Sequence, residues 1–106
     1  MQSIEILEKL ISFPTVSKDS NLDLIEFVEG YLTEHGISSK RVPNKKGTKA
    51  NLYATIGPMK EGGIILSGHT DVVPVEGQPW DTDPFVLTEK EDRLYGRGTC
   101  DMKAYA

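Results

Sequence analysis

Apolar and polar residues recur with the spacing of two amphipathic helices in the first third of the chain. The stretch "SIEILEKLISF" has Ser3 as a candidate N-cap, and we expect its helix to stop before Pro14. The second helix begins at a capping box formed by Ser20 and Asp23 and ends at Gly36, a candidate C-cap. Each helix has one apolar face, which predicts packing against another element. These faces consist of Ile4, Leu7, Leu10 and Ile11 in the first helix, and Leu24, Ile25, Val28 and Leu32 in the second.

From residue 37 the pattern changes to that of short strands. The stretches "ISSKRVP", "NLYATIG" and "GIILSG" carry β-branched residues and are bounded by Gly, Pro or Asn, whereas "GPMKEGG" is typical of a turn. Three consecutive apolar residues in "GIILSG" predict a central strand buried on both faces. The stretches "FVLTEK" and "RLYGRG" flank Glu91 and Asp92 and predict a hairpin, and "DMKAYA" begins like a helix at Asp101.

The order of these elements predicts an α/β fold, with a layered mixed sheet and flanking helices. The 106 residues suit one small domain or a piece of a larger one. The last predicted helix has only about six residues, too few for a stable helix on its own. We therefore expect a chain cut within a longer domain, with exposed apolar surface and strand edges that favour association or poor solubility.

The composition narrows the range of partners. Twelve Lys and Arg residues against sixteen Asp and Glu residues give a net charge of -4, which argues against nucleic acid or an anionic membrane as the main partner. Charged residues interrupt the N-terminal apolar pattern, so it does not resemble a secretory signal, and no apolar run has the length of a membrane helix. Cys100 is the single cysteine, which excludes an intrachain disulfide and fits a reducing compartment. We expect a cytoplasmic protein.

His69 and Asp71, in "SGHTDVVP", are the first candidates for chemistry. They follow the predicted buried strand, and residues i and i+2 of an extended chain point to the same side. An imidazole that ligates a metal is commonly oriented by a carboxylate, which Asp71 could supply. Taken alone, this spacing favours a simpler interpretation, in which His69 is a hydrogen-bonded histidine at the start of a loop.

Asp101, in "LYGRGTCDMK", adds a second candidate ligand. Gly96 and Gly98 permit a tight backbone path, and a carboxylate at the start of a helix suits a hard or borderline cation. Alternatively, Asp101 simply caps the predicted helix. A dinucleotide-binding loop is disfavoured because Asp101 replaces the third glycine of that motif.

Other candidates are weaker. Ser67 lacks the glycines of a nucleophile elbow, and His35 suits a structural position at a helix C-terminus. We interpret Cys100 as a buried thiol or one that supports the Asp101 site, and Trp80 as the anchor of a long loop that could also line a substrate pocket. A solvated basic face is expected from Lys40, Arg41, Lys45, Lys46 and Lys49.

The motifs "SGHTDVVP", "WDTDPF" and "LYGRGTCDMK", taken in order, resemble the zinc-dependent deacylase and exopeptidase family. The resemblance covers almost the whole chain and implies that residues 1–106 form the N-terminal part of a metallohydrolase catalytic domain. It also implies that the family's lid or dimerisation domain is absent from this chain. One departure is Ala104, which stands where the family has glycine and puts the packing after Asp101 in doubt.

The resemblance implies a role for each candidate residue. His69 matches a histidine that ligates one metal ion, and Asp101 matches the carboxylate that bridges two. Asp71 matches the catalytic-site aspartate that supports the histidine. The cofactor implied is one or two Zn²⁺ ions, with Co²⁺ as a substitute. The family's general-base glutamate and other ligands lie further along, so we expect the isolated chain to bind metal weakly and to hydrolyse nothing measurable.

The implied reaction is metal-assisted hydrolysis of the amide bond in a small-molecule N-acyl amino acid. The motifs are most similar to those of family members that act on N-acetylornithine in arginine biosynthesis, and the full-length form is a candidate homodimer. Two alternatives remain open. One is N-succinyl-diaminopimelate or a peptide as substrate, and the other is a non-catalytic remnant or interaction module on the same scaffold.

Overall fold

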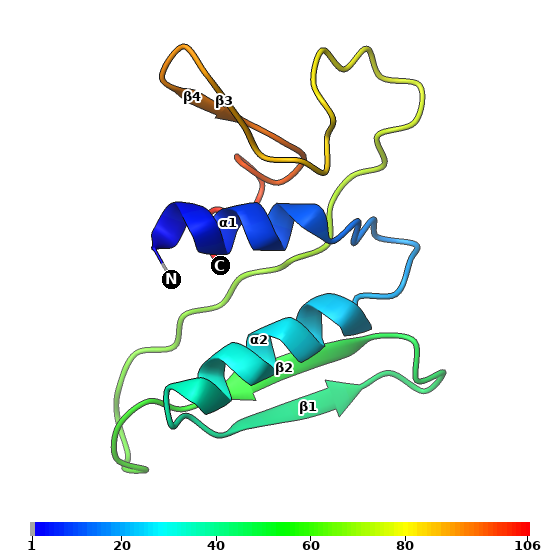
Figure 1. The fold of residues 1–106 in the computed structure, drawn as a ribbon. Coiled ribbons are helices and arrows are strands. Elements are labelled where there is room, and N and C mark those ends of the chain that lie inside the picture. Colours follow the sequence, from blue (N-terminus) through cyan, green and yellow to red (C-terminus); the bar gives the residue numbers. More distant parts are fainter. Residues whose placement is uncertain (1) are drawn as a thin grey trace. The chain divides into compact units, whose positions relative to one another are not determined.

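The computed structural model describes residues 2–106, which form two helices and two pairs of antiparallel strands (Figure 1). This mixed α/β composition agrees with the predicted fold class. The chain divides into two compact units: one comprises the residues up to Asp19 together with Gly68–Ala106, and the other comprises Ser20–Ser67. Every candidate ligand identified in the sequence belongs to the first unit.

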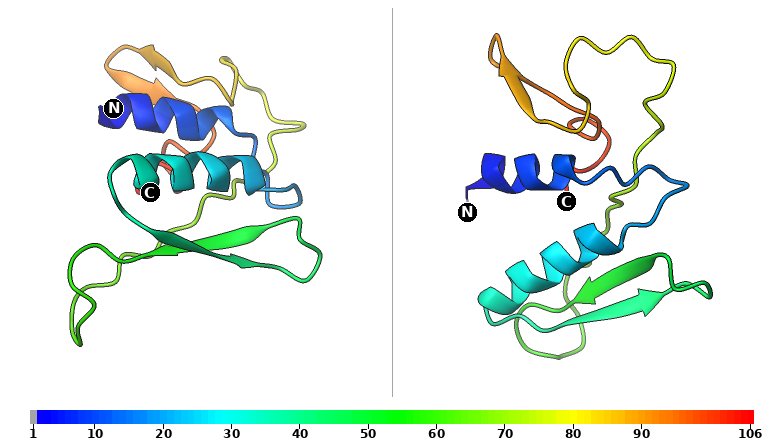
Figure 2. Two further views of the ribbon diagram at one scale, coloured as in Figure 1. Left: turned by 60° about the horizontal axis from the view of Figure 1, so that its bottom comes forward. Right: turned by 45° about the vertical axis from the view of Figure 1, so that its right-hand side comes forward.

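The Ser20–Ser67 unit consists of one helix packed on a hairpin. Helix α2 (Leu22–Glu34) precedes strands β1 (Ser39–Pro43) and β2 (Ala50–Ala54), which pair antiparallel. Both views of Figure 2 show α2 lying along one face of this hairpin. The first two predicted strands are therefore confirmed, within three residues at their ends. The buried residues of this unit are Leu24, Ile25 and Ala50.

The ends of α2 differ in how well the sequence predicted them. Instead of the expected capping box, Asn21 is the N-cap residue, and its side-chain amide hydrogen-bonds to both the backbone nitrogen (3.0 Å) and the carbonyl oxygen (2.9 Å) of Ala50. At the other end, Gly36 adopts a φ of 72°, and the amide of Ile37 donates to the carbonyl of Leu32 over 2.9 Å. This left-handed glycine ends the helix as predicted.

The predicted central strand "GIILSG" is wrong for this structure. Residues 63–68 form no strand, and the side chains of Ile64, Ile65 and Leu66 are 90%, 84% and 81% exposed. A strand buried on both faces needs hydrogen-bonded neighbours on its edges and layers above and below. Among residues 2–106, "GIILSG" has no such neighbours, because β1 pairs only with β2 and β3 only with β4.

The other unit contains helix α1 (Ser3–Ser12) and the hairpin of β3 (Thr88–Lys90) and β4 (Arg93–Tyr95). The helix ends before Pro14 as predicted, but Gln2 rather than Ser3 is its N-cap residue. The hairpin is also as predicted. Its two turn residues, Glu91 and Asp92, have φ angles of 52° and 61°, the left-handed values that a tight two-residue hairpin turn requires.

Small apolar contacts hold this unit together. Its buried apolar side chains include those of Leu10, Ile11, Val16 and Val72. Gly96 lies against α1 so closely that an added Cβ would be 3.1 Å from Cγ2 of Ile11. This close approach of the backbone to Ile11 explains why residue 96 is a glycine.

The last six residues do not form the predicted helix. They make turns in which the amide of Tyr105 donates to the carbonyl of Met102 over 2.9 Å, and the amide of Ala104 donates to the carbonyl of Gly98 over 3.2 Å. The peptide bond between Asp101 and Met102 is cis. A segment this short has too few internal hydrogen bonds to stabilise a helix by itself.

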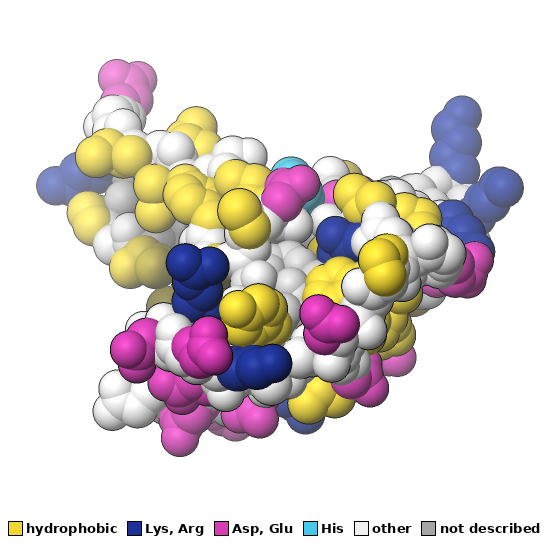
Figure 3. Space-filling model, turned by 90° about the horizontal axis from the view of Figure 1, so that it is seen from above, with side chains coloured by type: hydrophobic (Ala, Val, Ile, Leu, Met, Phe, Trp, Pro, Cys, Tyr) yellow, Lys and Arg dark blue, Asp and Glu magenta, His cyan; other side chains and the backbone are white. Residues whose placement is uncertain are grey.

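Charged and apolar side chains are interspersed on the surface drawn in Figure 3. Among the described residues, no helix combines the length and the apolar character needed to cross a membrane.

Candidate functional site

The segment that carries His69 and Asp71 is positioned by backbone contacts within its own unit. Val72 forms a parallel β-bridge with Val16, which replaces the predicted strand as the element that fixes this segment. Gly68, just before His69, lies against the ring of Tyr105, where an added Cβ would be only 2.9 Å from Cδ1. A larger residue at Gly68 would therefore displace Tyr105 or the start of the candidate site.

Asp71 lies against one side of the His69 ring, as their spacing predicted. Its Oδ1 is 3.1 Å from Nδ1 of His69, and its backbone carbonyl oxygen is 3.2 Å from the same nitrogen. Both side chains are about half exposed, at 51% and 50%. Two acceptors of Asp71 therefore face Nδ1, so a proton on this nitrogen would be hydrogen-bonded and Nε2 would carry the lone pair.

Asp101 lies against the other side of the ring. Its Oδ1 is 3.3 Å from Nε2 of His69, and its side chain is 74% exposed. Gly98, with a φ of 105°, provides the tight backbone path that the sequence indicated just before Asp101. The structure therefore brings together the three residues singled out from the sequence, in the order Asp71, His69, Asp101.

The spacing of His69 and Asp101 can be compared with that of two ligands on one ion. Ligand atoms about 2.0–2.1 Å from a tetrahedral zinc ion are separated from each other by about 3.3 Å. The separation of Nε2 and Oδ1 is 3.3 Å. An imidazole nitrogen and a carboxylate oxygen are also donors that zinc and cobalt accept. This pair could therefore hold one side of a metal ion.

The pair does not make a complete metal site. Among residues 2–106, no group of three His, Cys, Asp or Glu side chains is arranged to hold a metal ion. A structural or catalytic zinc ion takes about four ligands, at least three of them from protein in most sites. Further ligands would have to come from outside the described residues or from water.

The structure also describes two other candidates from the sequence. Cys100 is exposed rather than buried. His35 belongs to the other unit, where its Nδ1 lies 2.8 Å from the carbonyl oxygen of Tyr31 near the end of α2. The structural interpretation of His35 is consistent with this contact.

Sequence patterns missed three residues around the site. Lys103 is 1% exposed, and its ammonium group donates a hydrogen bond of 2.6 Å to the carbonyl oxygen of Phe13. Burial lowers the pKa of Lys103 from 10.5 to about 8. Thr15 and Ser17 hydrogen-bond to the segment that carries Asp71. Nothing in the local pattern distinguished these residues, because their partners are more than fifty positions away.

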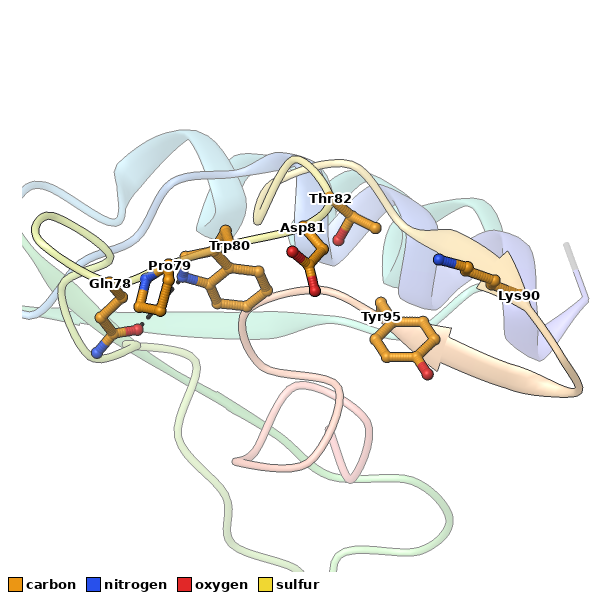
Figure 4. A pocket seen from close by; sticks show the side chains of 7 residues that line it. All are labelled: Gln78, Pro79, Trp80, Asp81, Thr82, Lys90 and Tyr95. Carbon is orange, nitrogen blue, oxygen red and sulfur yellow. Dashed lines mark hydrogen bonds between the residues drawn. The ribbon is translucent and has the colours of Figure 1, made fainter.

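A separate cavity of about 380 Å³ lies beside the β3–β4 hairpin (Figure 4). Trp80 lines it, and its indole nitrogen donates to Oε1 of Gln78 over 3.3 Å, while the guanidinium of Arg97 lies 5.0 Å from the ring. Trp80 thus has contacts that anchor its loop and also a place in a cavity wall. The lining residues are Gln78, Pro79, Trp80, Asp81, Thr82, Lys90 and Tyr95.

Residues 65–106 match the model of Peptidase family M20/M25/M40. The matched region includes His69, Asp71 and Asp101, together with the segments between them. This part of the chain is therefore similar to that family.

Curated relatives extend the similarity over nearly the whole chain. The chain is 44% identical over 110 aligned residues to an acetylornithine deacetylase of Buchnera aphidicola subsp. Schizaphis graminum, and 43% identical to that of Photorhabdus laumondii. Each alignment covers 96% of this chain but only 28% of the relative, so the chain spans less than a third of their length.

A solved structure shows the same arrangement of backbone. The crystal structure of human carnosine dipeptidase 1 superposes with a TM-score of 0.80 at 26% sequence identity. The superposition covers 95% of this chain and 25% of that one. The mixed α/β arrangement described above is thus similar to one part of a larger solved protein.

Proposed function

We propose that these residues form the N-terminal, metal-binding part of the catalytic domain of a hydrolase that removes the acyl group from an N-acyl amino acid. The observation that carries the proposal is the position of His69 between two carboxylates, with Asp71 at Nδ1 and Asp101 at Nε2. A carboxylate on the far nitrogen of a ligating histidine is the usual arrangement around a protein-bound metal ion.

The residues present fit zinc, with cobalt as a substitute. His69 would contribute Nε2 and Asp101 would contribute Oδ1, the two atoms whose separation matches that of neighbouring zinc ligands. When bound, the metal would lower the pKa of a coordinated water and polarise the acyl carbonyl. Asp71 would keep the proton of the imidazole on Nδ1, so that Nε2 presents its lone pair to the metal side.

The substrate is proposed from the names of the relatives. Those that are 40–44% identical are acetylornithine deacetylases, which favours the small molecule N-acetylornithine as the substrate. The more distant solved structure, at 26% identity, is a carnosine dipeptidase. A dipeptide is therefore the second candidate. Both substrates would be cleaved at an amide bond, with the same two residues holding the metal ion.

A chimera tests this function in a complete protein. Residues 1–106 would replace the aligned segment of the Proteus mirabilis acetylornithine deacetylase, to which the chain is 44% identical. We expect zinc- or cobalt-dependent release of acetate from N-acetylornithine. His69→Ala and Asp101→Ala should each reduce that rate to background, because each removes a metal ligand.

Matched controls change the same residue types elsewhere. His35→Ala and Asp92→Asn should leave the rate close to that of the unsubstituted chimera, since His35 belongs to the other unit and Asp92 is a turn residue of the β3–β4 hairpin. A folded chimera that stays inactive with zinc and with cobalt would contradict the proposal. So would unchanged activity after loss of His69 or Asp101. Faster turnover of carnosine than of N-acetylornithine would transfer the proposal to the dipeptide.

A further inference from the structure

The segment that links α1 to the second unit forms one side of the candidate site. Residues 15–17 run parallel to residues 70–72, with the amide of Val72 donating to the carbonyl of Thr15 over 2.9 Å. The amide of Ser17 returns a hydrogen bond of 3.1 Å to the carbonyl of Val72. Both hydrogen bonds involve Val72, so the backbone is held directly after Asp71.

Thr15 adds a buried side-chain contact to this pairing. It is 3% exposed, and its hydroxyl donates to the carbonyl of Thr70 over 2.6 Å. Val16 and Val72, at 8% and 2% exposed, supply the apolar contact beneath the pairing. The backbone between His69 and Asp71 is therefore fixed from the N-terminal part of the chain, by residues more than fifty positions away.

Ser17 acts on the side chain of Asp71 as well. Its hydroxyl donates a hydrogen bond of 2.5 Å to Oδ2 of Asp71, and the other oxygen of that carboxylate, Oδ1, lies 3.1 Å from Nδ1 of His69. A carboxylate with one oxygen bound in this way has little freedom to rotate about its last side-chain bond. Its second oxygen then stays in the plane in which the imidazole can donate to it.

We infer that Ser17 is a positioning residue of the candidate site, which holds the carboxylate of Asp71 so that its Oδ1 faces Nδ1 of His69 while Nε2 faces Asp101. The role of Ser17 in metal binding rests on the proposed function. The contacts from Ser17 to Asp71 and from Asp71 to His69 are present without a metal ion. Outer partners of metal ligands commonly change metal affinity by about 10–100-fold. Ser17 is one contact further out, so we expect an effect near the lower limit, about tenfold.

The first experiment measures the protonated nitrogen of His69 without metal. In the ¹⁵N-labelled chain, at a pH where the ring is neutral, the nitrogen shifts report the fraction of His69 with its proton on Nδ1. Ser17→Ala should lower this fraction, because the freed carboxylate of Asp71 no longer holds Oδ1 at the ring. Ser17→Thr should restore it, since threonine keeps the hydroxyl.

Controls separate the hydroxyl of Ser17 from a general loss of structure. Ser12→Ala removes a hydroxyl that donates to the carbonyl of Lys9 over 2.6 Å in α1, and should leave the fraction unchanged. Ser17→Cys keeps the shape with a weaker donor and should also lower the fraction, which covers the case in which the alanine variant does not fold. Equal fractions in wild type and in the folded Ser17 variants would overturn the inference. Failure of threonine to restore the fraction would do the same.

A second measurement links Ser17 to the metal. In the chimera, zinc affinity should fall about tenfold in Ser17→Ala and recover in Ser17→Thr. If the chain binds no zinc but the Nδ1 fraction still depends on Ser17, the proposed function fails and the positioning role stands. If zinc binds through His69 and the fraction of His69 protonated on Nδ1 does not depend on Ser17, the proposed function stands and the positioning role fails.

Discussion

The ammonium group of Lys103 and the carbonyl oxygen of Phe13 form a hydrogen bond of 2.6 Å between residues 90 positions apart. It joins the C-terminal end of α1 to the segment that follows Asp101. Lys103 is 1% exposed, and its aliphatic chain lies against Gly98. The loop that presents Asp101 is therefore held by a buried cation rather than by a helix.

The burial of Lys103 predicts a pH dependence of stability. Its pKa is lowered from 10.5 to about 8 in the folded chain, so between these values the unfolded chain binds more protons and the free energy of unfolding rises with pH. Below pH 8 both states carry the charge and the full cost of burying it is present. The predicted gain on raising the pH through this window is about 3 kcal/mol.

Chemical denaturation of the wild type and of Lys103→Met from pH 7 to pH 10 measures this effect. Other groups titrate in both proteins, so the difference in unfolding free energy isolates Lys103. The unfolding free energy of the wild type should rise relative to that of Lys103→Met as the pH increases. A difference that is constant with pH would show that Lys103 titrates alike in the folded and unfolded chains.

Gly98 should tolerate a side chain poorly. It has a φ of 105°, and an added Cβ would lie 3.0 Å from Cδ of Lys103. Gly98→Ala should lower the unfolding free energy by about 1–3 kcal/mol, from strain and displacement of the lysine chain. Gly30→Ala is the matched control, because Gly30 lies within α2 with no atom within 4 Å of an added Cβ.

The control should change stability in the opposite direction. Alanine replaces glycine in a helix with a gain of about 0.5–1 kcal/mol. Thermal unfolding of both variants, followed by circular dichroism, gives the two signs. Equal effects of the two substitutions would contradict the close packing of Gly98 on Lys103.

Local patterns predicted the elements that local interactions stabilise. Both helices, strands β1 and β2, the β3–β4 hairpin and the left-handed Gly36 follow from periodicity, turn residues and a C-cap glycine within a few positions. The proximity of His69 and Asp71 was predictable for the same reason, because their spacing alone places them on one side of an extended chain.

Features that depend on distant partners were predicted less well. "GIILSG" has the composition of a central strand, but it has no neighbouring strands among the described residues and stays exposed. The approach of Asp101 to His69 was expected from family resemblance rather than from any pattern. The contacts of Thr15, Ser17 and Lys103 each span more than fifty residues, and a serine or lysine in a loop carries no sequence signal for such a partner.

The exposed apolar residues of the 63–68 segment predict self-association. Ile64, Ile65 and Leu66 follow one another and are each more than 80% exposed, which favours association between chains. Replacing Ile65 with lysine should reduce the associated fraction in sedimentation velocity at matched concentration. Replacing Ile4, an exposed apolar residue of α1, should have a smaller effect. A monomeric wild-type chain at high concentration would contradict this prediction.

The central claim is that His69 and Asp101 form part of a metal site, and a zinc titration of the ¹⁵N-labelled chain tests it most directly. We expect a weak interaction that moves the Nε2 resonance of His69, leaves those of His35 in place and disappears in Asp101→Asn but not in Asp92→Asn. Zinc that shifts both histidines alike, or that acts on His69 equally well without the Asp101 carboxylate, would contradict the claim.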